Sequence, residues 1–236
     1  MALSLCNTTT NEHGRELIEH GTVLFPVACY DDDLIKKSVP WHWHDELEAV
    51  IVSEGTALIA AGTKKYTVKQ GEGIFINAGI LHAAWSMKCS VCHLHSITFH
   101  PRLIGGSIDS IFWHNYIQPL LTNPIVKHIH LDSSEAWHKK ATHAIESAWN
   151  SCANEPFGYE FQVRSSLSEL ILHLSAYHPV ISRQPSEKVL RNSNRLKLML
   201  QFIQDHYPDQ INVSMIADTA MISESECLRC FRNIIG

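Results

Sequence analysis

Three histidines and one glutamate have the most specific spacing in the sequence. His42 and His44 are separated by one residue, Glu48 follows in the same stretch, and His82 lies further along the chain. If residues 41–48 are extended, the side chains at positions 42, 44, 46 and 48 share one face, so imidazoles and carboxylates point the same way. Neutral imidazoles with a carboxylate can hold Zn, Fe, Mn or Ni. His42, His44, Glu48 and His82 are therefore candidate ligands of a divalent metal, although no cofactor is required by the pattern.

The same side chains also suit a pocket for a small organic molecule. A chain with 16 histidines brings some of them together by chance, and imidazoles also serve as hydrogen-bonding walls of a pocket without any metal. Trp43 lies between the first two histidines, and an aromatic face beside a few polar groups is typical of sites for sugars and similar molecules. Trp43 is therefore predicted to line an effector pocket with the four polar residues.

Short strands are expected to position these residues. Strand-like runs separated by glycines occupy residues 22–30, 47–53, 57–61, 65–69, 74–77 and 91–99. Short strands with glycine turns at such intervals are typical of an antiparallel barrel or a jelly roll. The polar segment up to about Arg15 has no periodicity, and we expect it to form a loosely held arm.

Helices are expected in the middle of the chain. Residues 107–116 predict a short helix that ends at Pro119, and residues 125–131 an irregular or short strand segment. A helix capped by Ser133 or Ser134 is expected to run to about residue 152, because apolar residues recur there every three or four positions. A second helix is expected to run to about residue 177, with Phe161 in its apolar set. Such a pair packs on the barrel, on itself or on another subunit.

The last stretch, residues 212–236, predicts a helix, a tight turn and a second helix. Asn212 can cap the first helix, and Ser223 with Glu226 forms a capping box for the second. Small Ala217 allows the close crossing that a helix-turn-helix requires. The outward side chains of the second helix are then Ser225, Leu228, Arg229 and Arg232.

Two interpretations of this helix pair are open. In DNA-binding proteins the second helix enters the major groove, and nearby cations contact phosphates. Arg195, on a helix expected over residues 195–207, is such a cation. Helical hairpins are also common packing units without any nucleic acid.

Composition limits the class of protein. The chain has 236 residues, 45% of them hydrophobic, which is enough for one large or two small cores. A net charge of -5 argues against general coating of nucleic acid, although basic residues gather in the last fifth. No apolar run approaches the roughly 20 residues of a membrane span, and no export signal is recognisable. A cytoplasmic protein with mostly reduced cysteines is expected.

The spacing of the four polar residues resembles the two signature motifs of the cupin superfamily, whose matching positions bind a metal. Asn77 stands where that pattern has proline. Barrel, helical pair, linker and helix-turn-helix, in this order, resemble the AraC/XylS family of bacterial transcription regulators. The resemblance implies an α+β fold, with a cupin-like effector-binding barrel (1–105), a helical dimerisation segment (106–180), a linker (181–192) and a first helix-turn-helix (193–236).

The resemblance also implies a function. It predicts a homodimeric regulator without enzymatic activity, which binds double-stranded DNA through base-facing Ser225, Leu228 and Arg229, responds to a sugar or related acid, and has RNA polymerase as a further partner. Met221 stands where the family usually has a turn glycine. The family has a second helix-turn-helix, expected to begin where this sequence stops, so weak and poorly specific DNA binding is expected from the chain as given.

Two alternatives to this regulator remain open. The barrel could be a metal-dependent enzyme such as a dioxygenase or an isomerase. The chain could also be an effector-binding dimer whose headpiece is inactive.

Overall fold

The structure is a computed structural model that describes residues 3–4, 8–12, 14–87, 90–123, 125–178 and 210–234, together with residues 191, 195, 198–199, 202–203 and 206. The chain divides into two compact units, Met1–Val180 and Ile181–Gly236. Most of the expected linker and half of the expected helix over residues 195–207 lie outside the described residues.

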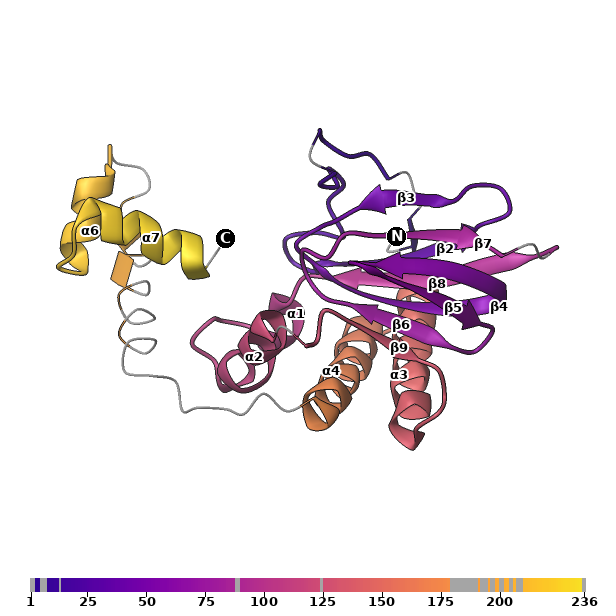
Figure 1. The fold of residues 1–236 in the computed structure, drawn as a ribbon. Coiled ribbons are helices and arrows are strands. Elements are labelled where there is room, and N and C mark those ends of the chain that lie inside the picture. Colours follow the sequence, from indigo (N-terminus) through magenta and orange to yellow (C-terminus); the bar gives the residue numbers. More distant parts are fainter. Residues whose placement is uncertain are drawn as a thin grey trace. The chain divides into compact units, whose positions relative to one another are not determined.

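The first unit is built on a mostly antiparallel sheet (Figure 1). Hydrogen-bonded neighbours follow the order β1-β2-β8-β4-β6-β9, β3 pairs with β7, and both β5 and β7 pair with β4. Among the named strands of the described residues, only the β1–β2 pair is parallel. The strands are β1 (Leu3–Ser4), β2 (Val27–Asp33), β3 (Val39–His42), β4 (Leu47–Ala61), β5 (Lys64–Lys69), β6 (Gly73–Ile76), β7 (His82–Ser86), β8 (Cys92–Phe99) and β9 (His128–Leu131).

Strand β4 joins the two halves of this sheet. Its first part pairs with β6, and its second part pairs with β5 and β7. The pairing with β8 shifts register between Val52 and Glu54. Gly55 follows that bulge with a φ of 80°, and a Cβ there would lie 2.0 Å from the Val91 carbonyl oxygen. Gly55 thus allows one continuous strand, and the prediction of two strands separated by a turn was wrong.

Both faces of the first part of β4 are buried. Leu47, Ala49 and Ile51 belong to the core that includes the helices, whereas Val50 and Val52 belong to a second core. A strand covered on both faces reads as a nearly continuous apolar run, which is why the sequence alone did not decide its buried face. Alternation places Glu48 on the same face as Val50, and both line one cavity.

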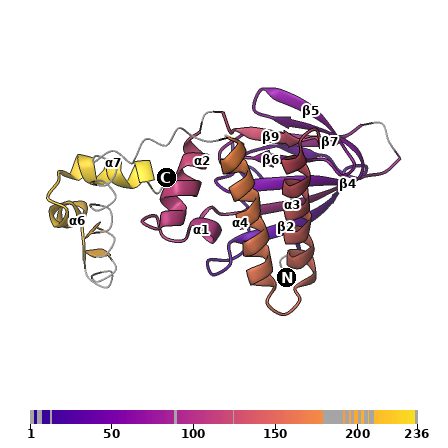
Figure 2. The same ribbon diagram turned by 90° about the horizontal axis from the view of Figure 1, so that it is seen from below.

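Two long helices, α3 (Ala136–Asn154) and α4 (Tyr159–Tyr177), lie side by side under the sheet (Figure 2). Both predicted helices are confirmed. Trp149 of α3 donates a 2.8 Å hydrogen bond to the carbonyl of Tyr30 in β2, which ties the helix to the sheet. The buried stripe of α3 is Trp137, His138, Ala141, Ala144, Ile145, Ala148, Trp149 and Cys152.

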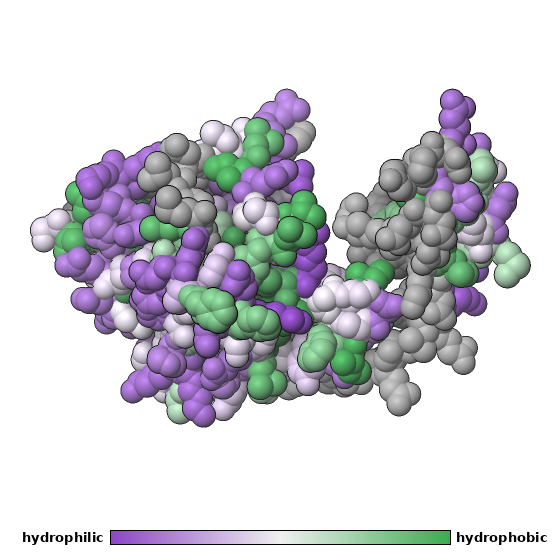
Figure 3. All heavy atoms as spheres, turned by 180° about the vertical axis from the view of Figure 1, so that it is seen from behind, coloured by the Kyte–Doolittle hydropathy of each residue, from purple (hydrophilic) through white to green (hydrophobic). Residues whose placement is uncertain are grey.

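The prediction that Phe161 lies on the buried face of α4 was wrong. Its side chain is 81% exposed, and Leu172 on the same helix is 53% exposed. Figure 3 shows hydrophobic side chains grouped on parts of this unit's surface, between extensive hydrophilic areas. The buried face of α4 consists of Val163, Leu167, Leu170, Ile171 and Leu174.

Between β8 and α3, the short strand expected within residues 125–131 is confirmed as β9, whereas the part before it differs from the prediction. That part contains α1 (Arg102–Gly105), the π-helical turn η1 (Trp113–Ile117) and α2 (Gln118–Thr122). Pro119 lies in the first turn of α2, where a backbone N–H would have no partner within that helix. Proline is therefore tolerated there and begins a helix instead of ending one. The expected serine cap of α3 is also absent, because the described N-cap is Glu135 without a side-chain bond.

Asn77 fastens this segment to the sheet. Its side chain is 5% exposed in a buried site, and its Nδ2 donates to the carbonyls of Leu120 at 2.8 Å and Val126 at 2.7 Å. Its backbone N–H donates to the carbonyl of Lys127 at 2.9 Å. Proline, which the cupin pattern has at this position, could make none of these bonds.

Replacing Asn77 with aspartate should lower the free energy of unfolding of the first unit by about 2–4 kcal/mol. The change keeps the size of the side chain but removes both donors, and each buried carbonyl left unpaired costs about 1–3 kcal/mol. Urea denaturation followed by tryptophan fluorescence measures the loss. The matched control is Asn150→Asp on the exposed side of α3, expected within about 0.5 kcal/mol of the parent. Equal stability of the two variants would contradict the role given to Asn77.

The second unit contains α6 (Val213–Thr219) and α7 (Glu224–Ile234). The predicted cap is confirmed, because Asn212 Oδ1 accepts a 3.0 Å bond from the Met215 N–H. Ala217 is 1% exposed at the helix crossing. Met221 has a φ of 52°, so the turn is left-handed at a residue other than glycine. The structure thus forms the predicted helix, turn and helix.

No helix in the described parts of either unit combines the length and the apolar character that crossing a membrane requires.

Candidate metal and ligand site

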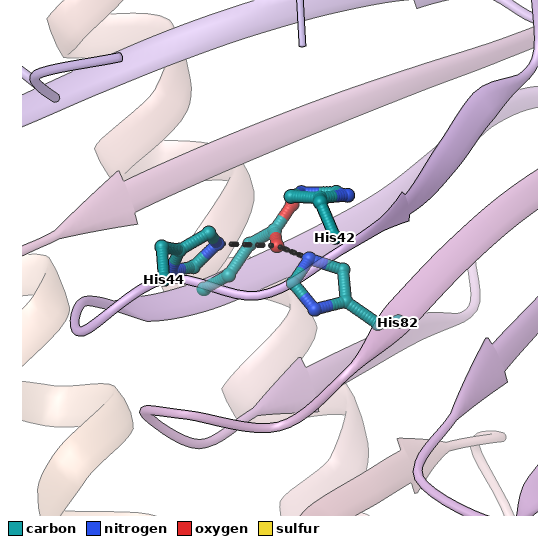
Figure 4. Close-up of side chains that lie close together, drawn as sticks. His42, His44 and His82 are labelled. Carbon is teal, nitrogen blue, oxygen red and sulfur yellow. Dashed lines mark hydrogen bonds and ion pairs between the residues drawn. The ribbon is translucent and has the colours of Figure 1, made fainter. Parts of the chain in front are cut away.

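The four polar residues of the sequence motif meet inside the first unit. His42 ends β3, His82 begins β7 directly opposite it in the ladder, and Glu48 lies in β4. All four residues, including His44, are at most 9% exposed. Their potential ligand atoms lie within 4.8 Å of one another. Figure 4 shows His44 and His82 directed at one carboxylate oxygen, with His42 beside them.

The expected route to this cluster was wrong in one respect. Residues 41–48 do not form one extended strand, because β3 ends at His42 and β4 begins at Leu47. His44 therefore reaches the cluster from the connection between the strands, and Glu46 is not part of it. A bend in the chain, and not a shared strand face, brings the two motif histidines together.

Backbone carbonyls fix the orientation of all three imidazoles. Because a carbonyl only accepts hydrogen bonds, each Nδ1 must carry the proton, and in a neutral ring Nε2 then presents its lone pair. An imidazole held in this way by its second nitrogen is the usual arrangement of a metal-ligating histidine. The Nδ1 contacts are His42 to Pro40 O at 2.9 Å, His44 to Glu46 O at 3.2 Å and His82 to Ile80 O at 2.7 Å.

Glu48 lies at the centre of the cluster. Its Oε2 is 3.3 Å from His44 Nε2 and 2.8 Å from His82 Nε2, yet the His82 contact lacks the geometry of a hydrogen bond. Burial alone would raise the pKa of Glu48, but the charge of His82 and the bond from His44 hold it well below its usual value. Burial lowers the pKa of His82, and the charge of Glu48 more than offsets this and raises it. Buried negative charge is thus matched by positive charge.

These four residues fit a divalent metal ion. Three Nε2 atoms and one carboxylate converge, and His82 Nε2 is buried without a hydrogen bond. Such a mixed nitrogen and oxygen set suits Zn, Fe, Mn or Ni. A bound cation would supply a positive anchor for an acid or hydroxyl group of a ligand.

The cavity at this cluster is small. Its volume is about 40 Å³, whereas sites for small organic ligands usually measure about 300–1,000 Å³. A buried water needs roughly 10–15 Å³ by a similar measure, so the cavity has room for an ion and a few waters. Glu16 and His20 from the amino-terminal segment line it beside the motif residues. A sugar-sized molecule would fit only if this segment moved.

The amino-terminal segment is held more firmly than the sequence predicted. Trp43 N–H donates to Gly14 O at 3.0 Å, and Glu16 N–H donates to Trp43 O at 2.9 Å. The Arg15 guanidinium lies 5.8 Å from the centre of the Trp43 ring and forms a 2.5 Å ion pair with Asp45. The expectation of a loosely held arm up to Arg15 was therefore wrong for residues 14–15. Trp43 contacts this segment, and it is not one of the described residues that line the cavity.

Glu16 and His20 were missed by sequence reasoning. Both are part of a second cluster with His44, whose potential ligand atoms also lie within 4.8 Å of one another. Their only sequence signal is a glutamate four residues before a histidine, which occurs on many exposed helices without any function. Their role depends on contacts with a distant part of the chain.

The second unit exposes most of the expected DNA-contacting residues. Ser225, Leu228 and Arg229 are exposed on α7. Arg229 forms an ion pair with Glu226, and Arg195 lies 3.8 Å from the same carboxylate. Glu226 N–H donates to Ser223 Oγ at 3.3 Å, which is one half of the predicted capping box. The side chain of Arg232 lies outside the described residues.

Comparison with known proteins gives consistent matches. Residues 24–149 match the family described as the AraC-like ligand binding domain. The chain is 29% identical over 233 residues to YdeC, an uncharacterised HTH-type transcriptional regulator of Bacillus subtilis (strain 168), and the match covers 98% of this chain and 78% of YdeC.

Two solved structures align with most of the chain. A ToxT variant from Vibrio cholerae strain SCE256 in its apo form has a TM-score of 0.44 at 11% identity, covering 92% of this chain and 95% of that one. The AraC-like transcriptional activator CuxR has a TM-score of 0.41 at 11% identity, covering 88% of this chain and 67% of that one.

Proposed function

The chain belongs to the family of the AraC-like ligand-binding domain, and from this premise we propose that it is a DNA-binding transcription regulator controlled by a small polar effector. The observation that carries the proposal is the helix pair of the second unit. Ala217 and Cys227 are buried at the crossing, whereas Ser225, Leu228 and Arg229 stay exposed on α7. A catalytic domain would have no use for such an appendage.

DNA recognition is assigned to α7. Its early exposed residues, Ser225, Leu228 and Arg229, would face base edges in the major groove, and Arg195 and Arg232 would contact phosphates. Arg195 and Arg229 share the carboxylate of Glu226 in the free protein. Binding would therefore exchange these contacts for contacts with DNA, which lowers the net gain from each arginine.

Effector recognition is assigned to the buried cluster. His42, His44, Glu48 and His82 would contact a sugar or a related acid, with or without a divalent metal. The ligand can shift the regulator only by its difference in affinity between two arrangements of the protein. Since the described cavity has room for only a few waters, the arrangement that binds such an effector would have Glu16, Ile18 and His20 moved away from the cluster.

The proposed regulator acts as a homodimer in the cytoplasm, with RNA polymerase as a further partner. The helical pair α3 and α4 would form the subunit contact. The domain boundaries proposed for this assembly are 1–105, 106–180, 181–192 and 193–236.

A metal-dependent enzyme is the competing function, and the convergence of three imidazoles and one carboxylate favours it. Elemental analysis together with substrate screening separates the two. Bound metal with turnover of a substrate would support a dioxygenase or isomerase. Bound metal without turnover agrees with a regulator. An effector-binding dimer with an inactive headpiece would bind ligand but no DNA.

The direct test of the regulator is binding to the DNA upstream of its own gene. Fluorescence anisotropy should show an affinity that falls steeply with salt, because cations on the protein replace counterions on the phosphates. The same titration with sugars and sugar acids should change that affinity for at least one compound. Absence of salt-sensitive binding, also when any further carboxy-terminal sequence of the gene is included, would refute the proposal.

Replacing Arg229 with alanine should lower the affinity for the specific site about 10-fold or more. A good arginine contact with a base contributes about 1–3 kcal/mol of discrimination. Anisotropy titrations with specific and scrambled DNA measure the change. The control is Lys139→Ala on the exposed face of α3, which also removes one positive charge. Equal losses in both variants, or equal losses on both DNAs, would contradict base contact by Arg229.

A further inference from the structure

Glu16 is a buried carboxylate in a segment that the sequence pattern left without a role. Its side chain is 5% exposed. Its Oε2 lies 3.1 Å from His20 Nε2 and 3.8 Å from His42 Nε2. His20 is anchored in turn by a 2.7 Å hydrogen bond between its Nδ1 and the Tyr30 hydroxyl. The carboxylate is therefore held among imidazoles, at the edge of the cluster that includes Glu48.

The two clusters form one continuous set of donors. His44 belongs to both, and its ring centre lies 5.1 Å from those of His20 and His82. Glu16 and Glu48 both line the same cavity of about 40 Å³. Two carboxylates sharing so small a space repel each other strongly unless positive charge lies between them. Imidazoles beside both carboxylates supply part of that charge, and the available volume also suits a metal ion.

We propose that Glu16 is a further ligand of a divalent cation held by His42, His44, Glu48 and His82, so that the cation fastens the amino-terminal segment over the cluster. The barrel residues provide four donors, and Glu16 provides a fifth donor from the segment between β1 and β2. Zn and similar ions accept five ligands as well as four. Removal of the cation therefore releases the segment.

In this arrangement, the stability of the closed segment depends on whether the cation is bound. The backbone bonds of Gly14 and Glu16 with Trp43 hold the segment without a cation. The exposed pair of Arg15 with Asp45 adds little, because exposed ion pairs contribute little to stability. A buried bond from Glu16 to a cation adds a strong contact. The link from segment position to DNA binding rests on the proposed function, whereas the cation site itself does not.

The test is hydrogen exchange of the full chain, measured by mass spectrometry with and without Zn²⁺. In the parent, Zn²⁺ should slow exchange of the amides in residues 14–20 at least about 10-fold, because opening must first break the bond to the cation. In Glu16→Gln, Zn²⁺ should still bind through the other donors but leave exchange in this segment unchanged. Glu19→Gln, an exposed neighbour in the same segment, should behave like the parent.

Cobalt absorption provides the second readout. The visible bands of Co²⁺ depend on the number of ligands, so Glu16→Gln should keep Co²⁺ binding with an altered spectrum, and Glu19→Gln should keep the parental spectrum. The proposal is overturned if the parent binds neither ion, if Zn²⁺ protects the segment equally in Glu16→Gln, or if the Co²⁺ spectrum of Glu16→Gln is unchanged. None of these readouts involves DNA, so loss of DNA binding with intact Zn²⁺ protection counts only against the proposed regulator.

Discussion

Replacing Glu48 with glutamine should lower the affinity of the chain for Zn²⁺ at least about 100-fold. Glutamine keeps the size and one carbonyl oxygen of the side chain but removes the negative charge that lies 2.8 Å from His82 Nε2 and 3.3 Å from His44 Nε2. Changing a residue that only orients a metal ligand already costs about 10–100-fold. Glu48 is the one carboxylate that β4 contributes to the cluster. Its loss should lower the affinity for Zn²⁺ at least as much.

Two measurements check this expectation. Competition with a chromogenic chelator gives the Zn²⁺ affinity, and thermal unfolding with and without Zn²⁺ gives the linked stabilisation. Ligand at 100 times its Kd stabilises the folded state by about 2.7 kcal/mol, so the parent should gain this amount and Glu48→Gln should not. Glu54→Gln is the control, because it changes an exposed glutamate of the same strand. Equal Zn²⁺ affinity in both variants would remove Glu48 from the site.

The motif residues could be predicted because their spacing is local and their chemistry is specific. His42, His44 and Glu48 lie within seven residues, so a short bend suffices to bring them together. The path of the chain between these residues was harder to predict, because the same spacing is compatible with a bend at His44 and with one extended strand. Glu16 could not be predicted, because it is positioned by hydrogen bonds to Trp43, 27 residues further along the chain.

The fold was predictable where one periodicity dominates. The stripe on α3 identified a helix because its apolar residues repeat at the helical period and are buried. The strands β3 (Val39–His42) and β7 (His82–Ser86) were not identified as such, because they are only 4 and 5 residues long and have no clear alternation. Gly55 and Pro119 were misread because both residues break regular structure in some contexts and permit it in others.

The fold leaves an apolar face of α4 exposed in the first unit. Phe161 lines two surface grooves, of about 450 and 500 Å³. Phe112 and Leu172, 54% and 53% exposed, also line the first of these grooves. Contiguous exposed apolar patches on a protein commonly mark interaction sites. This face suits the subunit contact proposed for the helical pair.

Replacing Phe161 with glutamate should therefore convert the proposed dimer to monomers, raising the dimer dissociation constant at least about 100-fold. Burying one phenylalanine side chain contributes about 1.5–3 kcal/mol, and a two-fold interface contains the residue twice. Sedimentation equilibrium measures the change. Unfolding is not expected, because Phe161 is 81% exposed in the single chain.

The same substitution tests whether dimerisation is coupled to DNA binding. A monomer carries half the reading helices of a dimer, so Phe161→Glu should also weaken binding to a two-half-site DNA much more than binding to a single half-site. Ile125→Glu is the matched control, because Ile125 is 78% exposed and lines neither groove. If Phe161→Glu remains as dimeric as Ile125→Glu, the contact lies elsewhere. If the parent is monomeric at concentrations where it binds DNA, two α7 helices are not needed and the homodimer is refuted.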